Sequence, residues 1–394
     1  MIPADVRRAA LPLLLPLLLL AASCDRQTEE ARPTIPLVRE ILSDRADYRA
    51  LVLRAATPKP ASDIAIIGSE FACERLAEQF CFRDEQDNVD ARRHGDGLPD
   101  FAGETFVCIE DARPYEAVLE ENGEEELRRQ TVLRVLAALD TTVHISPYDV
   151  DGLSTKGRSK MVVLADPYLA EYGGFDVDTL LRSTGCAVPV ISPVERMIGR
   201  AFEKSGRGDP TVAILCAPQF AGSGIYERIF ARMAGERGLQ GASCVVSGVE
   251  RKDSLLRRFL RGYLEGGQAR PLDAVLIDDL SVNPDSLKFE LAEIVSVMNE
   301  SSMTYGRLIP RDFFFLNAFE EVADCAHDFL RDHNLFTHNI AMPRISVYRP
   351  AKRPDTDDGS IILIPGSYVQ NEHPVRRNRE NAPRIFPRQD PGNR

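Results

Sequence analysis

The sequence predicts an α/β protein with two similar lobes, each built on a mainly parallel sheet flanked by helices. Short β-branched runs alternate with helical stretches of about a dozen residues, a pattern typical of parallel strands joined by helices. The alternation falls into two series, separated by a break near 196–209. The chain of 394 residues is long enough for two domains, at roughly 100–200 residues each.

The first series has five strand candidates, each rich in Ile, Val or Thr and bounded by turn residues. They are Asp63–Gly68, Thr105–Ile109, Thr142–Ile145, Met161–Ala165 and Ala187–Ile191. Helices are clearest between them at Glu124–Leu139 and Val177–Ser183. An amphipathic helix is expected before the first strand, over Leu37–Ala56, because its apolar residues recur at helical spacing.

The second series has four strands and four helices. The strands are Thr211–Cys216, Ala242–Ser247, Ala274–Ile277 and either Arg307–Pro310 or Phe313–Leu316. The helices are Ile225–Arg237, Asp253–Glu265, Ser286–Asn299 and Glu320–His333. Two more strands, Arg344–Tyr348 and Ile361–Pro365, close the ordered part.

These patterns divide the chain into six segments. We expect a signal peptide at 1–23, a lipidated cysteine and tether at 24–36, a first lobe at 37–200, a second lobe at 201–350, a closing strand segment at 351–374 and a disordered basic tail at 375–394. The apolar fraction of 44% and charged fraction of 27% are ordinary for a folded protein. The 48 basic and 60 acidic side chains give a net charge of −12, which argues against a general nucleic-acid binder.

The first 24 residues have the layout of an export signal. Arg7 and Arg8 form a basic start, and the apolar run Ala9–Ala22 is interrupted by two prolines, which makes it a poor membrane span. The ending Ala-Ala-Ser-Cys resembles the lipobox of bacterial lipoproteins. This resemblance implies cleavage before Cys24, lipid on its sulfur and an acylated amine, with the body outside the cytoplasm at the bacterial cell envelope. The alternative is an ordinary secretory signal with an incidental cysteine.

Seven cysteines follow Cys24. An odd number leaves at least one free thiol in an oxidising compartment. Cys73 and Cys81 are near enough in sequence to form a pair, but two free core thiols are favoured. The chain has no CxxC, so neither a zinc ribbon nor a thioredoxin-like centre is supported. No other motif indicates a cofactor or a metal site.

Candidate ligand-binding residues follow the predicted strands. In open parallel sheets, ligands bind outside the carboxyl ends of the strands, where loops meet helix N-termini. Polar residues at these places are helix caps or turn residues in the alternative interpretation. The candidates are Ser69, Ser146, Asp166, Ser192, Gln219, Ser223, Tyr226 and Asp278.

One stretch carries a family resemblance. Thr179–Ser192 (TLLRSTGCAVPVIS) reads as helix, turn and strand, and VAILCAPQFAGSGIYERIF then reads as strand, Gly/Ser loop and helix. This order resembles the type I periplasmic solute-binding proteins over about residues 60–350. The resemblance implies a small polar ligand clamped between lobes that close by hinge motion, for delivery to a transporter or a sensor. The insertion at 83–100 and the short crossover after Ser192 depart from that family.

Two other functions stay open. The first is an envelope hydrolase acting on a glycan or a peptide, with His94, Asp96 and Asp166 in acid–base roles. The sequence has no GxSxG or HExxH motif to support it. The second is a scaffold lipoprotein that uses the same fold to hold partners. The aspartates at 84–100 do not have EF-hand spacing, so a solvated acidic loop is favoured there over a calcium site.

Overall fold

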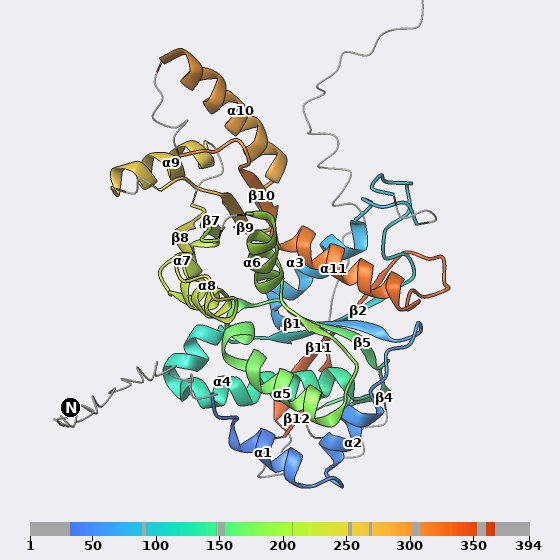
Figure 1. The fold of residues 1–394 in the computed structure, drawn as a ribbon. Helices are drawn as coiled ribbons and strands as arrows, with labels where there is room; N and C mark the ends of the chain where they lie inside the picture. Colours follow the sequence, from blue (N-terminus) through green and yellow to red (C-terminus); the bar gives the residue numbers. More distant parts are fainter. Residues whose placement is uncertain are drawn as a thin grey trace, which may run out of the picture. The chain divides into compact units, whose positions relative to one another are not determined.

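The computed structural model describes residues 32–366, apart from 89–91, 147, 149–153, 207, 251–253, 268–269, 302–307 and 353–359. The predicted export signal, with Cys24, and the predicted basic tail therefore lie outside the described residues. The described chain forms an α/β protein with two main sheets, which confirms the predicted class (Figure 1). Residues from Thr34 onward form one compact unit that contains both sheets.

The first sheet has six strands in the order β12-β11-β2-β1-β5-β6. All neighbours are parallel except β12, which runs antiparallel to β11. The strands are β1 (Asp63–Ser69), β2 (Thr105–Asp111), β5 (Ser159–Leu164), β6 (Val190–Ile191), β11 (Arg344–Lys352) and β12 (Ile361–Pro365). The central strands β1 and β5 read as apolar runs because helices cover both of their faces.

The second sheet has four parallel strands in the order β10-β9-β7-β8. The strands are β7 (Thr211–Cys216), β8 (Ser243–Gly248), β9 (Ala274–Asp278) and β10 (Phe314–Asn317). The fourth strand thus forms at the second of the two predicted places. On one face lie α9 (Leu255–Glu265) and α10 (Pro284–Ser301), which enclose an apolar cluster of their own.

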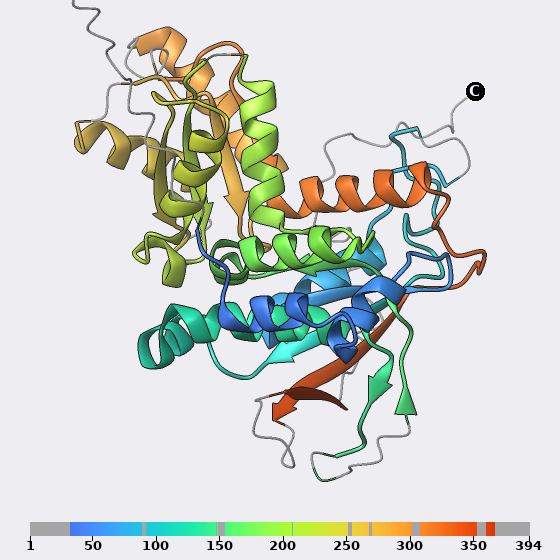
Figure 2. The same cartoon turned by 60° about the horizontal axis from the view of Figure 1, so that its bottom comes forward.

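Helices cover both faces of the first sheet (Figures 1 and 2). One face carries α3 (Glu70–Phe82) and α11 (Ala318–Asp332). The other carries α4 (Tyr115–Leu139) and α5 (Gly174–Thr184), with the short helices α1 (Pro36–Ser43) and α2 (Tyr48–Ala55) packed against them. The single helix predicted over Leu37–Ala56 is therefore two helices, because Asp47 caps a new start by accepting the N–H of Arg49.

Two helices connect the sheets. The chain leaves the first sheet through α6 (Pro193–Lys204) and returns to it through α11, and these helices pack against each other. The return brings β11 beside β2 in the first sheet. Here the structure differs from the predicted division, which placed 201–350 in the second lobe and 351–374 in a separate closing segment.

One apolar cluster runs through both lobes. It joins Val107 and Ile109 of the first sheet to Val212 and Ile214 of the second, through buried residues of α6 and α8 (Ile225–Glu236). A shared core of this kind holds the lobes together, since separating them would expose apolar surface. The α/β class is thus shown, whereas the type I periplasmic-binding-protein fold with independently moving lobes is not confirmed.

Two smaller predictions have clear outcomes. Thr142–Ile145 is not a strand of the parallel sheet: Thr142 and Val143 form β3, which pairs antiparallel with β4 (Ser154–Thr155). Cys73 and Cys81 are separate buried thiols, the favoured alternative. Within the described residues, no helix has the length and apolar character needed to cross a membrane.

Candidate functional site

Each main sheet has a topological switch point, where the strand order reverses. In the first sheet, β2 lies on one side of β1 and β5 on the other; in the second, β8 and β9 flank β7 in the same way. Loops diverge at such points and leave room for a ligand outside the carboxyl ends of the strands. Asp166 follows β5, and Asp278 is the last residue of β9. Each switch point therefore carries an aspartate.

Asp166 is buried and has one backbone donor. Asp166 is only 6% exposed, and the N–H of Tyr168 donates to its Oδ1 at 2.9 Å. The pKa of Asp166 is raised to about 7, mainly by burial and to a smaller extent by the charges of Asp278 and Asp111, against the effect of that hydrogen bond. At neutral pH the Asp166 carboxyl group is therefore close to half-protonated and can donate or accept a proton.

Asp278 belongs to the other lobe and is held by a tyrosine. The hydroxyl group of the fully buried Tyr226, on α8, donates to Asp278 Oδ2 at 2.5 Å. Burial raises the pKa of Asp278 to about 6; the Tyr226 hydrogen bond opposes this rise, and the charge of Asp279 adds to it. The Asp278 charge is also one of the smaller causes that raise the pKa of Asp166.

Contacts between the lobes fix this arrangement. Tyr168 packs on Phe220, which in turn packs edge-on against Tyr226, with ring centroids 6.2 and 6.3 Å apart. The Ser223 hydroxyl donates to the carbonyl of Phe220 at 2.8 Å and accepts the N–H of Ile225 at 3.2 Å. Burial raises the pKa of the nearby Tyr168, and the Ser223 side chain opposes that rise. Arg232 of α8 binds Glu171 at 3.1 Å. The side chains next to both aspartates are thus positioned by packing.

A third carboxylate lies at the end of β2. Asp111 accepts two hydrogen bonds from Arg134 of α4, with Nε at 2.5 Å, and a short one from the Tyr115 hydroxyl. Burial disfavours the Arg134 charge, but Asp111 keeps the pKa of Arg134 above its usual value. Because Arg134 neutralises Asp111, the unpaired acidity of the site lies on Asp166 and Asp278.

The structure brings four predicted residues together: Asp166, Ser223, Tyr226 and Asp278. Ser192 follows β6 beside the end of β5, since Ile191 pairs with Val163. It is 2% exposed, and its hydroxyl has no hydrogen-bond partner among the described residues. Such a buried, unpaired hydroxyl is available to a ligand.

Three predicted residues lie differently. Ser69 ends β1 and caps α3, where its hydroxyl accepts the N–H of Ala72 at 3.4 Å. Gln219 is exposed on α7 (Pro218–Ala221). Ser146 is not at the carboxyl end of the parallel sheet: it follows β3, and the N–H of neighbouring His144 donates to Leu363 of the edge strand β12. Three strands (β11, β2 and β1) separate β12 from β5 in the first sheet. The prediction that Ser146 lies at a parallel-strand end beside Asp166 is therefore corrected.

The candidate list omitted Tyr168, Asp111, Arg134 and Tyr115. Asp111 and Tyr168 follow predicted strands, so the sequence places both at strand ends, although neither is among the eight chosen candidates. Arg134 lies within a helix and has no local signal, because its partner Asp111 comes from a different element. A different acidic group has spacing suitable for a metal ion within the described residues: Glu70, Glu74 and Glu110.

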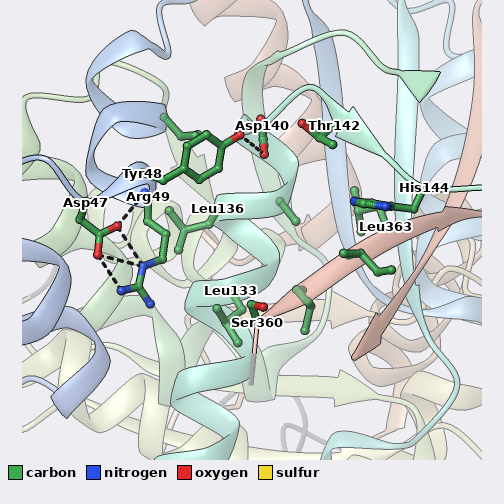
Figure 3. Close-up of a pocket in the computed structure, with 14 residues that line it drawn as sticks. Asp47, Tyr48, Arg49, Leu133, Leu136, Asp140, Thr142, His144, Ser360 and Leu363 are labelled. Atoms are coloured by element: carbon green, nitrogen blue, oxygen red, sulfur yellow. Dashed lines mark hydrogen bonds and ion pairs between the residues drawn. The ribbon is translucent and has the colours of Figure 1, made fainter. Parts of the chain in front are cut away.

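A pocket of about 480 Å³ lies away from the switch points, between α2, α4 and β12 (Figure 3). Its walls are largely aliphatic, including Leu133, Leu136 and Leu363. Its polar groups are already paired, since Tyr48 donates to Asp140 at 2.8 Å and Arg49 binds Asp47 at 2.6 Å. This pocket offers shape and apolar surface but few unpaired groups for a polar solute.

The inserted loop at 83–100 is held by its own acidic residues. Asp100 accepts the N–H groups of Glu85 and Gln86 at 3.0 Å, and Asp96 accepts that of Leu98 at 2.8 Å. His94 lies 3.7 Å from Asp87 and is exposed. Asp90 lies outside the described residues. His94 and Asp96 thus occupy an exposed loop, where Asp96 has a structural role.

Comparisons with known proteins give structural similarities only. No family model matches the chain, and no curated protein matches it. Solved structures with a similar arrangement include glutamate racemase RacE1 from Bacillus anthracis, with 12% identity and a TM-score of 0.43 over 74% of this chain and 90% of that one. The glutamate racemases of Francisella tularensis and Campylobacter jejuni have 11% and 9% identity and TM-scores of 0.42 and 0.36. They cover 74% and 72% of this chain, and 88% and 92% of their own. None of these similarities identifies the chain.

Proposed function

We propose that this chain binds a small polar solute between its lobes, with a hydrogen-bond donor or a cationic group directed at Asp166 and Asp278. The observation that carries this proposal is the chain of contacts that links the two aspartates: the N–H of Tyr168 donates to Asp166, Tyr168 packs on Phe220, Phe220 packs on Tyr226, and Tyr226 donates to Asp278. Like charges held together away from water are unfavourable, so a donor or cation placed between them is stabilised. A primary amine is the simplest group that meets this requirement.

Neighbouring groups support a polar solute. The unpaired hydroxyl of Ser192 is available beside the end of β5, and Tyr226 holds the orientation of Asp278. Because Arg134 is already engaged by Asp111, it does not neutralise the other two carboxyl groups. We infer that the solute carries positive charge or hydroxyl groups and is not an anion.

The export signal sets the cellular context of this proposal. Lipidation of Cys24 would tether the body at the bacterial cell envelope, outside the cytoplasm. A tethered solute-binding protein would present its ligand to a transporter or a sensor at the membrane. The shared apolar core favours binding with local rearrangement over a wide hinge closure.

The decisive experiment measures retained and added solutes on residues 25–394, which contain the whole compact unit. Native mass spectrometry would identify a co-purified molecule, and thermal shifts would then be measured with amino acids, polyamines, sugars and nucleosides. A ligand at 100 times its Kd adds about 2.7 kcal/mol to the free energy of unfolding.

Matched variants locate the site. Asp166→Asn and Asp278→Asn are expected to abolish the ligand-induced shift, whereas Asp178→Asn, which changes an exposed aspartate on α5, should keep it. A shift that survives both site variants would place the ligand elsewhere. A protein that neither retains nor responds to any solute would favour the scaffold alternative.

An enzyme is the second candidate, and the pKa values favour it. Carboxyl groups with pKa values of about 7 and about 6 are suited to giving and taking protons near neutral pH. The pair would be Asp166 and Asp278, and no longer His94 and Asp96. Turnover of a bound solute, lost in either asparagine variant, would establish catalysis.

A further inference from the structure

Three glutamates converge at the start of α3, on the face of the first sheet opposite Asp111. Glu70 is the first residue of α3 and Glu74 lies one turn later, on the same helix face. Glu110 sits in β2 directly beside Gly68, because β1 and β2 are parallel neighbours. One carboxylate oxygen from each residue lies within 4.8 Å of the others.

Glu110 gives the second observation. It is 2% exposed, and its Oε1 is buried without a hydrogen-bond partner among the described residues. An uncompensated buried carboxylate is unfavourable, and nearly all such groups in proteins have a donor or a cation. The dipole of α3 explains acids at Glu70 and Glu74, but it does not explain a buried acid in the neighbouring strand.

The cation already present does not neutralise the group. Arg349 approaches Glu70 at 3.5 Å, and both side chains are at least half exposed. The pKa of Glu110 is raised to about 7, mainly by burial and then by the charges of Glu74 and Glu70, against the smaller opposing effect of Arg349. Burial and the neighbouring Glu70 and Glu78 also raise the pKa of Glu74.

We propose that Glu70, Glu74 and Glu110 bind a divalent cation, and that this cation is Ca²⁺. Two oxygens of one Ca²⁺ shell lie at most about 5 Å apart, twice the Ca–O distance of roughly 2.3–2.6 Å, so three oxygens within 4.8 Å of one another can share one Ca²⁺. Ca²⁺ is favoured over Mg²⁺ because its coordination shell is flexible, whereas Mg²⁺ demands near-ideal octahedral geometry. The three ligand atoms are hard oxygens, which disfavours Zn²⁺ and copper. Exposed Glu70 provides the entry, and water completes the coordination.

The ion would clamp the N-terminus of α3 to β2. Glu110 and Asp111 are successive residues of β2, so their side chains point to opposite faces of the sheet, and Asp111 faces α4. The cation site therefore lies on the other face and does not depend on the proposed solute function. Loss of one site therefore leaves the other testable.

The test is isothermal titration of CaCl₂ into the full chain in detergent, after treatment with EDTA and removal of the chelator. One Ca²⁺ per chain is expected to bind, with a rise in Tm. Glu110→Gln and Glu74→Gln should each weaken binding at least tenfold. Glu125→Gln, which changes an exposed glutamate of α4, should bind like the unmodified chain.

Stability without metal separates loss of the site from loss of the fold. Glu110→Gln removes the unpaired buried charge, so its Tm in EDTA should equal or exceed that of the unmodified chain, while its Ca²⁺-dependent rise disappears. Exposed Glu70→Gln provides a second folded variant with weakened binding. The proposal is overturned if millimolar Ca²⁺ does not bind, or if all three site variants bind it unchanged.

Discussion

Asp278, in the second lobe, raises the pKa of Asp166 in the first. Asp166 follows β5, the neighbour of β1, and Asp278 ends β9, the neighbour of β7, so the relationship joins the two switch points.

The pH dependence of stability should report on Asp166. Its native pKa of about 7 lies above the ordinary value of 3.8, so the native state binds this proton more tightly than the unfolded state. The stabilising contribution is complete below about pH 4 and is lost as the pH rises through 7. Relative to Asp166→Asn, the free energy of unfolding should fall by up to about 1.4 kcal/mol per pH unit in this window.

Urea denaturation of both proteins between pH 4.5 and 8 measures this difference. Carboxyl groups present in both the wild-type protein and Asp166→Asn contribute equally to the pH dependence, so their effects cancel in the difference. Relative to Asp278→Asn, the free energy of unfolding of the wild-type protein should likewise fall as the pH rises toward about 6, the native pKa of Asp278. A difference between wild type and Asp166→Asn that does not change with pH would contradict burial of the ionisable group.

Tyr226→Phe tests the hydrogen bond that holds Asp278. Removing the hydroxyl leaves a buried carboxyl oxygen without its donor, which should cost about 1–3 kcal/mol of stability. It should also raise the pKa of Asp278 further, because this hydrogen bond lowers it. Thermal denaturation measures the first effect, and Tyr148→Phe, at an exposed tyrosine, should be neutral. Equal stability of both variants would show that the bond is not formed.

Most strands could be predicted because their signal is local. The β-branched runs that became β1, β2, β5 and β7 are buried by helices on both faces, so they are apolar throughout and bounded by turns. The return of β11 to the first sheet could not be predicted, because pairing of β11 with β2 depends on contacts far apart in sequence. Thr142–Ile145 has strand composition, but its Thr142 and Val143 pair antiparallel with β4, and His144 reaches the first sheet only at the edge strand β12.

The site residues also divide into those with a local sequence signal and those that depend on contacts between distant segments. Asp166 and Asp278 could be chosen because strand ends are visible in the sequence, and parallel sheets gather those ends. Arg134, Glu74 and the unpaired state of Glu110 depend on which helix covers which strand. That information lies in the packing of elements and not in any one segment.

A buried ion pair should contribute strongly to the first lobe. Lys160 Nζ lies 2.7 Å from Glu104, both are fully buried, and Lys160 also donates to the carbonyls of Pro60 and Leu335. Lys160→Met should cost about 3–5 kcal/mol, because it leaves the Glu104 charge uncompensated. Urea denaturation of Lys160→Met and of the double variant with Glu104→Gln measures this cost. The double variant should recover much of the loss, and failure to recover would indicate that the carbonyl contacts dominate.

Adjacent glycines give a matched test of the packing behind Asp166. A Cβ on Gly173, at the end of the π-helical turn Leu169–Gly173, would lie 2.3 Å from the Thr131 side chain on α4. Gly173→Ala should therefore destabilise by at least about 1–3 kcal/mol. A Cβ on Gly174 meets no atom within 4 Å, so Gly174→Ala should be neutral or slightly stabilising. Thermal denaturation compares them, and equal effects would mean that α4 does not pack closely there.

Lipidation at Cys24 would decide the cellular context of every proposal above. Each buried CH₂ of an acyl chain contributes about 0.8 kcal/mol, so several chains give an anchor that hardly dissociates. After expression in a bacterial host, the protein should partition into detergent and have a mass increased by its acyl groups. Cys24→Ala should lose both properties, whereas Cys325→Ala, at a half-buried thiol of α11, should keep them. If Cys24→Ala still partitions into detergent, some other part of the chain holds it at the membrane, and the solute site would need another route to a partner.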